Sequence, residues 1–298
     1  MSNIVHPDKE QWLIWRREHV TASDAAAILG ENDRRGPLAV YLEKTGLASG
    51  PEETVLMRHG RRMESVIADW YAEEKQRPLI DLGPLTVVQH PDLAWLGATL
   101  DRMHEDAALG PLEAKAVGGG QVSRWKDDEA PDEYRIQLQI QMACTGAQMG
   151  VLAAVLYGVQ LAVREEQRHE GFLRAVLPRL EEFQWRVLNK KPPEADATDG
   201  TKEALAKAFP NTDGSVVRLD EDALDIADAM AAARVEEKRY KEAAEECRNR
   251  LVQRMGAAQS ALLPDGSTLS LPLIKQPGYT VEPGPGYRKL SRSYKKKR

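Results

Sequence analysis

The sequence of 298 residues predicts a mixed α/β domain, with a central mixed sheet flanked by helices, followed by a helical appendage. Two patterns predict this class: helical spacing and short β-rich runs alternate over residues 1–195, and residues 220–255 contain neither Gly nor Pro. The composition, 42% hydrophobic and 29% charged, is ordinary for a globular protein and argues against global disorder. The length excludes a single small module.

The first part of the chain predicts helices joined by loops. Helical spacing is found at residues 12–16, 24–29, 38–44 and 53–75. Thr21 or Ser23 is a suitable cap for the second of these helices, and Gly30 closes it, because a short hydroxyl side chain accepts free N–H groups and Gly tolerates the left-handed end of a helix.

The character of the sequence then changes to short β-rich runs bounded by Gly, Pro and Asp. Strands are predicted at residues 85–89, 94–103, 111–117, 151–157 and 159–164. Helices are predicted between and after them, at residues 134–145 and 173–188. These elements together predict one domain over residues 1–195.

The remainder predicts a linker at 196–218, an appendage at 219–275 and a flexible basic tail at 276–298. The appendage combines a long helix, whose thin apolar stripe is expected to pack within the chain rather than in a long coiled coil, with a small hairpin around Asp265-Gly266. From Lys275 onward the chain has eight Lys or Arg and one acidic residue. The tail is therefore expected either to contact a polyanion or to be a solvated terminus.

Several classes of protein are excluded. The mainly apolar run at 150–163 is too short to span a bilayer, and the first residues lack the pattern of a secretory signal. Only Cys144 and Cys247 are present, which fits a reducing compartment and excludes a four-cysteine metal site.

Glu113 and Lys115 are the first candidates for chemistry. Residues two apart on a strand point to the same face, so both side chains share one face of the predicted strand at 111–117. A carboxylate and an ammonium among apolar neighbours are costly to bury unless they have a use. The alternative is an exposed ion pair on an edge strand.

Two further carboxylates are predicted near this pair. Asp101 ends a predicted strand twelve residues before Glu113, and a hairpin would bring the two together. Two close carboxylates repel, and Mg²⁺ or Mn²⁺ relieves that repulsion. Glu64 lies on the expected inward side of the helix at 53–75. The alternatives are a turn residue at Asp101 and a solvated position at Glu64.

Tyr134, Gln137 and Gln141 lie on one stripe of the helix predicted at 134–145. Amides that face a sheet can hold a water or a phosphate, although an interfacial amide in a satisfied network is the favoured reading of Gln141.

A cluster of basic and hydroxyl residues marks the junction of the first two helices. It consists of Arg16, Arg17, Thr21 and Ser23. Positive charge at a helix N-terminus forms a phosphate pocket. The alternative is a surface Arg pair beside an ordinary cap.

Taken in order, these residues belong to a longer series of motifs. The series is Trp12-x-x-x-Arg16 with Thr21-Ala-Ser23, Gly60-x-x-x-Glu64, Leu100-Asp101, Leu112-Glu-Ala-Lys115, Trp125, Tyr134-x-x-Gln137-x-Gln139 with Met142 and Thr145-Gly146, and Phe183-x-Trp-x-Val187. It resembles the lambda-type exonuclease family, also called YqaJ-like viral recombinases, of the PD-(D/E)XK nuclease superfamily. Leu100 departs from the Pro of the superfamily's name, and the resemblance leaves residues 200–298 unexplained.

The resemblance implies a restriction-endonuclease-like core and a metal-dependent exodeoxyribonuclease that digests double-stranded DNA from 5′ to 3′. The product would carry 3′ single-stranded overhangs for phage-type homologous recombination. The implied cofactor is Mg²⁺, with Mn²⁺ as a substitute. The implied partners are DNA ends, a single-strand annealing protein and a homo-oligomeric ring, with no membrane, in the cytoplasm of a bacterium or phage-infected host.

The resemblance also implies a role for each matching residue. Asp101, Glu113 and the carbonyl of Ala114 would bind the metal, and Glu64 would support a second metal or an ordered water. Lys115 would orient the attacking water and Gln137 would position it, with Tyr134 and Gln141 in support. The terminal 5′-phosphate would be received by Arg16 and Ser23, beside Arg17 and Thr21.

Two alternative functions remain open from the sequence. One is an endonuclease, structure-specific or restriction-like, that uses the same metal site. The other is a scaffold that binds DNA ends without catalysis, which predicts the loss of a metal ligand or of the lysine.

Overall fold

The computed structural model describes residues 2–106, 108–125 and 129–273. The chain divides into two compact units, Met1–Pro210 and Asn211–Arg298. The predicted sites all lie in the first unit.

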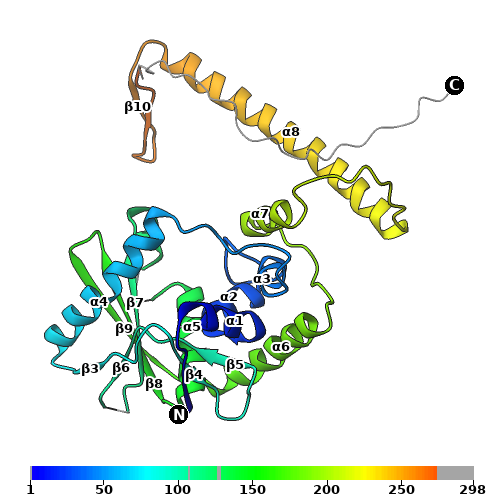
Figure 1. Ribbon diagram of the computed structural model, residues 1–298. Helices are drawn as coiled ribbons and strands as arrows, with labels where there is room; N and C mark the ends of the chain where they lie inside the picture. The colour runs from blue at the N-terminus through cyan, green and yellow to red at the C-terminus, as the bar shows by residue number, and fades with distance from the viewer. Residues whose placement is uncertain (1, 107, 126–128, 274–298) are drawn as a thin grey trace. The chain divides into compact units, whose positions relative to one another are not determined.

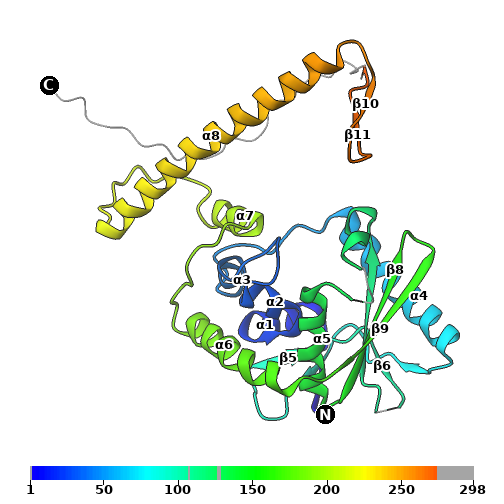
Figure 2. The same cartoon turned by 180° about the vertical axis from the view of Figure 1, so that it is seen from behind.

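A five-stranded mixed sheet forms the centre of the first unit (Figure 1). Its order is β3 (Leu79–Ile80), β6 (Arg102–His104), β7 (Pro111–Val117), β8 (Met149–Leu156) and β9 (Gln160–Gln167). Only the pair β7 and β8 is parallel. Helix α4 (Val55–Lys75) covers one face and α5 (Asp132–Thr145) covers the other, as Figures 1 and 2 show.

The alternation of side chains along β7 decides which residues face which helix. Leu112 and Ala114 pack with Ile67 and Tyr71 of α4. The residues between them point the opposite way because successive strand side chains alternate. Glu113 and Lys115 therefore face α5, and a one-residue change of register would reverse this arrangement.

A second, four-stranded sheet lies on the far side of α5. Its order is β1 (Ser2–Val5), β4 (Thr86–Gln89), β5 (Leu96–Ala98) and β2 (Val20–Thr21). The helices packed with it are α1 (Lys9–Glu18), α2 (Ala22–Leu29), α3 (Pro37–Lys44) and α6 (Glu170–Leu188). Helix α5 buries residues against both layers, with Ile136 and Ile140 on this side and Leu138 and Met142 on the other. It is the central helix of the unit.

The parallel pairing of β2 with β5 fixes the first helices beside the sheet end. Thr21 pairs with Gly97, so the α1–α2 junction lies next to the segment that leads to Asp101. A Cβ on Gly97 would lie 2.5 Å from the ring of Trp15 and 2.9 Å from Val87. Only Gly therefore permits α1 to pack this closely against β5.

Two expectations about boundaries are corrected. The strand expected at 94–103 is two strands, β5 and β6, in different sheets, and the chain crosses between the sheets at residues 99–101. The linker expected at 196–218 contains helix α7 (Asp199–Ala208), which packs against α3. The first unit therefore reaches Pro210 rather than residue 195.

The second unit contains α8 (Glu221–Met255) and a hairpin of β10 (Ser260–Leu262) and β11 (Thr268–Ser270). The hairpin turns at the predicted Asp265-Gly266. No residue of α8 is buried against the described residues, so the packing surface expected for its stripe is not found there. The basic tail at 276–298 lies outside the described residues. None of the described helices is both long and apolar enough to cross a membrane.

The two cysteines differ in environment, which gives a direct test of the fold. Cys144 of α5 is buried, and burial raises the pKa of its thiol to about 12, whereas Cys247 of α8 is exposed. Because the thiolate is the reactive form, we expect N-ethylmaleimide to label one thiol in the folded protein and both after unfolding. Intact-mass spectrometry measures the number of adducts. Cys247→Ser should abolish labelling of the folded protein, and residual labelling of this variant would place Cys144 in an open environment.

Candidate active site

A cleft of about 720 Å³ opens in the first unit at the point where the chain crosses between the two sheets. It brings together seven residues predicted from the sequence. They are Arg16, Thr21, Ser23, Glu64, Asp101, Glu113 and Gln137. Residues from α1, β2, α2, α4, α5, β7 and the turn after β5 thus converge on one space.

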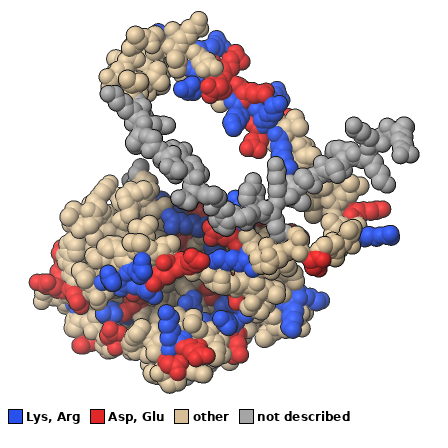
Figure 3. Space-filling model, turned by 45° about the horizontal axis from the view of Figure 1, so that its top comes forward, with Lys and Arg blue, Asp and Glu red and all other residues tan. Residues whose placement is uncertain are grey.

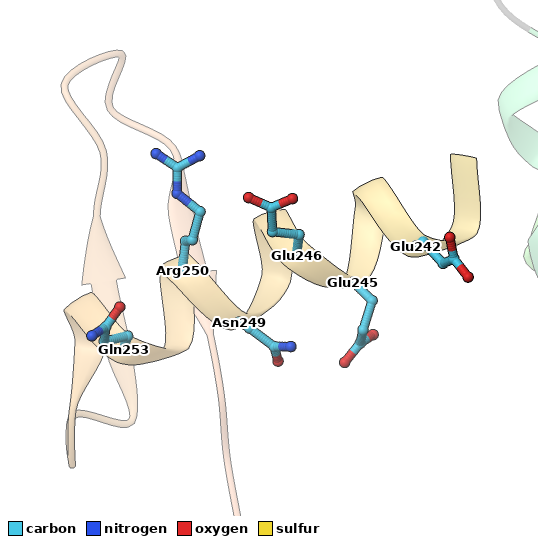
Figure 4. A pocket seen from close by; sticks show the side chains of 6 residues that line it. All are labelled: Glu242, Glu245, Glu246, Asn249, Arg250 and Gln253. Carbon is cyan, nitrogen blue, oxygen red and sulfur yellow. The ribbon is translucent and has the colours of Figure 1, made fainter. Parts of the chain in front are cut away.

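A second hollow, of about 580 Å³, lies on α8 (Figure 4). Its six lining residues are Glu242, Glu245, Glu246, Asn249, Arg250 and Gln253. They all come from one solvated helix, and Figure 4 shows them leaving it in different directions. Functional sites instead have polar groups that converge, so we assign the chemistry to the cleft.

Glu113 is the centre of the site. Its side chain is 3% exposed, and both carboxylate oxygens are occupied. Oε1 accepts hydrogen bonds from Lys115 Nζ and from Gln137 Nε2, the latter at 2.7 Å, while Oε2 accepts one from Gln141 Nε2 at 2.6 Å. The exposed edge-strand pair is therefore excluded, because β7 lies between two strands and Glu113 is buried.

Asp101 lies beside Glu113 and not in an isolated turn. The backbone N–H of Ala114 donates to Asp101 Oδ2 at 2.8 Å, which holds the carboxylate against β7. Burial, followed by the charges of Glu113 and Glu64, raises the pKa of Asp101 well above its usual range. The N–H and C=O of one strand residue face the same edge, so the Ala114 carbonyl also faces the Asp101 side.

Glu64 completes a group of three carboxylates from α4, β7 and the turn after β5. Burial, and next the charge of Glu113, raises the pKa of Glu64. It is neither a fully buried core residue nor a freely solvated one, and it lines the cleft.

Lys115 is oriented by charge and by an aromatic ring. Its ammonium lies 5.0 Å from the centroid of the Tyr134 ring on α5, within the range of a cation–π contact. Burial opposes the charge of Lys115, but the carboxylates of Glu113 and Asp101 outweigh it and raise the pKa of the ammonium. Lys115 is therefore a fixed positive charge at neutral pH, and it is not a proton acceptor in this state.

The site fits a hard divalent cation with oxygen ligands. Three mutually repelling carboxylates surround one end of the cleft, and a cation would relieve that repulsion. Within the described ranges, no three His, Cys, Asp or Glu side chains form a ready-made metal site. A cation here would therefore take one or two of these carboxylates and complete its shell with water and phosphate oxygens.

The second cluster lies at the α1–α2 junction. Arg16 donates to Ser23 Oγ at 3.2 Å and lies over the Trp12 ring, 4.8 Å from its centroid. The hydroxyl oxygens of Thr21 and Ser23 lie 3.0 Å apart. Arg17 is exposed and does not line the cleft, so the structure does not bring it into the pocket.

Sequence reasoning missed the buried charges beneath this cluster. Asp24 is bonded to Lys44 Nζ at 2.8 Å and to Arg35 at 3.2 Å, and it lies 3.9 Å from Arg16. Burial would raise the pKa of Asp24, but the three cations hold it far below its usual value. Lys44 also donates to the carbonyls of Arg16 and His19 and so fixes the end of α1. Asp24 inside an Ala-rich helix was the available signal.

His104 belongs to the core. It is 2% exposed and is bonded to the Tyr71 hydroxyl and the Gly110 carbonyl, at 3.0 and 2.8 Å. His104 is therefore a hydrogen-bonded core residue, and it does not line the cleft.

Surface charge does not by itself mark the substrate side. On the face visible in Figure 3, Lys and Arg side chains are interspersed with Asp and Glu. The candidates for contact with an anionic ligand are therefore the basic residues that line the cleft, namely Lys9, Arg16, Arg61 and Arg102.

Comparisons with known proteins agree with this architecture. Residues 11–148 match the YqaJ-like viral recombinase domain. The uncharacterized protein YqaJ of Bacillus subtilis (strain 168) is 26% identical over 214 residues, which span 70% of this chain and 65% of that relative.

Two solved structures share the fold. The alkaline exonuclease LHK-Exo of Laribacter hongkongensis is 23% identical, with a TM-score of 0.52. Its complex with dAMP is 22% identical, with a TM-score of 0.53. Each match covers 61% of this chain and 94% of the other. The restriction-endonuclease-like core predicted from the sequence is thereby confirmed.

Proposed function

This chain carries a YqaJ-like viral recombinase domain in residues 11–148, and on that premise we propose that it is a nuclease that digests double-stranded DNA from 5′ to 3′. The observation that carries the proposal is the convergence, in one cleft, of Asp101 and Glu113, the latter bonded to Lys115, with the Arg16–Ser23 pocket. The first cluster suits phosphodiester hydrolysis and the second suits a terminal phosphate. A cleft that contains both clusters can bind a DNA end and cleave the strand at a fixed distance from it.

The cation site would use Asp101, Glu113 and the carbonyl of Ala114, with Glu64 supporting a second ion or an ordered water. Mg²⁺, when bound there, would offset the negative charge of the phosphate and lower the pKa of the attacking water. Mn²⁺ presents similar ligand preferences and is the expected substitute.

The chain's own residues orient the reaction. The Lys115 ammonium, held by Glu113 and the Tyr134 ring, can donate a hydrogen bond to the attacking water and stabilise charge that develops on the phosphate oxygens. The Gln137 amide lines the cleft and can bind the same water. Preorganised donors of this kind act strongly because they do not need to reorient during the reaction.

The biological setting follows from the same chemistry. Removal of the 5′ strand leaves a 3′ single-stranded overhang, the substrate of homologous strand annealing. We therefore propose a role in phage-type recombination in the cytoplasm of a bacterium or infected host, beside a single-strand annealing protein. A ring-shaped homo-oligomer around DNA would make digestion processive.

The test is digestion of two DNA substrates with Mg²⁺. A linear duplex should be degraded from its 5′ ends, while a covalently closed circle should stay intact. Cutting of the circle would indicate an endonuclease, and binding of linear ends without cleavage in Mg²⁺ or Mn²⁺ would indicate a scaffold. A chelator should stop digestion of the linear duplex.

The Arg16 pocket predicts a preference for a 5′-phosphate over a 5′-hydroxyl. Charge-assisted hydrogen bonds contribute about 1.5–3 kcal/mol, so the preference in kcat/KM should be roughly 10- to 100-fold. Arg16→Gln should remove most of this preference by lowering the rate on the phosphorylated end. Arg17→Gln is the matched control, because Arg17 is adjacent but outside the cleft. Equal loss of preference in both variants would argue against a specific pocket.

A further inference from the structure

We propose that Gln141 is a positioning residue that fixes the Glu113 carboxylate for cation binding. The inference rests on the proposed cation site and goes beyond it, because Gln141 itself touches neither substrate nor cation. Gln141 is fully buried in α5, with 0% exposure, and is not among the residues that line the cleft.

The two oxygens of Glu113 have different kinds of partner. Oε1 is bonded to Lys115 and Gln137, whose side chains are half-buried, and Gln137 lines the cleft, where its amide can turn to a water or a phosphate. Oε2 is bonded to Gln141 Nε2 at 2.6 Å, on the closed side of the carboxylate. Gln141 therefore retains its bond to Glu113 when the other two partners are engaged in the reaction.

The same amide also reaches the segment that carries Asp101. Gln141 Nε2 lies 3.4 Å from the carbonyl oxygen of Thr99, two residues before Asp101. One buried group thus contacts both β7 and the turn between the sheets. These are the two backbone segments that must keep a fixed separation if Asp101 and Glu113 are to share an ion.

The environment of the Gln141 side-chain oxygen indicates that this residue does more than fill space in the core. Gln141 Oε1 is buried and has no hydrogen-bond partner among the described residues. An unsatisfied buried acceptor destabilises the fold, and an apolar residue of similar size would avoid that cost. The amide cannot turn over to relieve this cost, because its carbonyl oxygen would then face the Glu113 carboxylate.

The test compares Gln141→Leu with Gln139→Leu. Gln139 lies on the same helix and is also buried, at 7% exposure. Its amide is bonded to Gln167 O and His169 N, each at 2.8 Å, and it does not line the cleft. The two variants thus each remove a buried amide from one helix, and only the first loses a contact with Glu113.

Isothermal titration calorimetry with Mn²⁺ on the full-length protein without DNA gives the decisive readout. Loss of a group that orients a metal ligand weakens binding by about 10- to 100-fold, so Gln141→Leu should show this loss while Gln139→Leu stays within about threefold of wild type. Circular dichroism and the Tm report folding. If Gln141→Leu is unfolded, Gln141→Met supplies the same test with an unbranched side chain.

A second readout separates positioning from chemistry. The Mg²⁺ concentration for half-maximal cleavage should rise about 10- to 100-fold in Gln141→Leu, and the rate at saturating Mg²⁺ should stay within about tenfold of wild type. Wild-type Mn²⁺ affinity in a folded Gln141→Leu or Gln141→Met variant would overturn this inference alone. Absence of Mn²⁺ binding to the wild type would overturn the cation site of the proposed function and this inference with it.

Discussion

Asp101→Asn and Lys115→Met are each expected to slow cleavage of a linear duplex by about 100- to 1,000-fold, the range seen when one preorganised charge-stabilising group is removed from an active site. Asn removes the negative charge that would bind the cation but keeps the shape that accepts the Ala114 N–H bond. Met keeps the length and apolar contacts of Lys115 but removes its ammonium. The measurement is the initial rate on end-labelled duplex at saturating Mg²⁺.

Another carboxylate of the same cleft provides a matched control. Asp81 lines the cleft, but it is not bonded to Glu113, and its side chain is 56% exposed. Asp81→Asn should therefore change the rate by less than about tenfold, since exposed charges contribute little. A loss in this control as large as in the first two variants would mean that only the overall charge of the cleft matters. Full activity of Asp101→Asn would reject the assigned site.

Asp24→Asn should destabilise the folded protein by about 3–5 kcal/mol at pH 7, because removing one partner of a buried ion pair leaves the other charge uncompensated. Asp24 and Lys44 have side-chain exposures of 3% and 6%, so water cannot replace the lost carboxylate. The free energy of unfolding of a globular protein is about 5–15 kcal/mol, so this loss is a large fraction of the total stability. Urea denaturation followed by circular dichroism measures the difference.

The pH dependence of the same variant has a defined sign. The pKa of Asp24 is lowered on folding, so its contribution is complete above its unfolded value of about 4 and is lost as the pH falls below it. The stability difference between wild type and Asp24→Asn should therefore be constant near neutral pH and shrink in acid. Asp33→Asn is the control, because the Asp33 side chain is 87% exposed, and it should change stability by less than about 0.5 kcal/mol. A difference that grows in acid would contradict the ion pair.

Much of the fold was predictable because its signals are local. The helices α4, α5, α6 and α8 have a clear apolar spacing, and the strands β7 and β8 are apolar runs between turn residues. The elements that were missed, β1, β2, β3 and α7, are short or polar, and they form because distant partners complete them. Val20–Thr21, for example, is a strand only because it pairs with β5.

The interruption between strands β5 and β6, just before and at Asp101, shows most clearly what local sequence cannot predict. Local sequence reads as one strand from 94 to 103, since nothing near residue 99 signals a change of sheet. The two ends pair with different partners. Strand β5 lies between β4 and β2 in one sheet, whereas β6 lies between β3 and β7 in the other. The crossing was not predictable, but the hairpin expected from the sequence is present: β6 pairs antiparallel with β7, Arg102 opposite Leu112, and this brings Asp101 beside Glu113 and the Ala114 N–H.

The sequence by itself determined which residue types are available and which face of each element they occupy, because the periods of helix and strand are local properties of the backbone. It thereby determined that Glu113 and Lys115 share a face and that Gln137 and Gln141 share a stripe. Only the tertiary structure decided that these faces meet, that Arg17 stays outside the cleft and that Asp24 holds a buried charge network. Distances between segments and the burial of charges depend on contacts among residues far apart in the chain, and no local pattern encodes them.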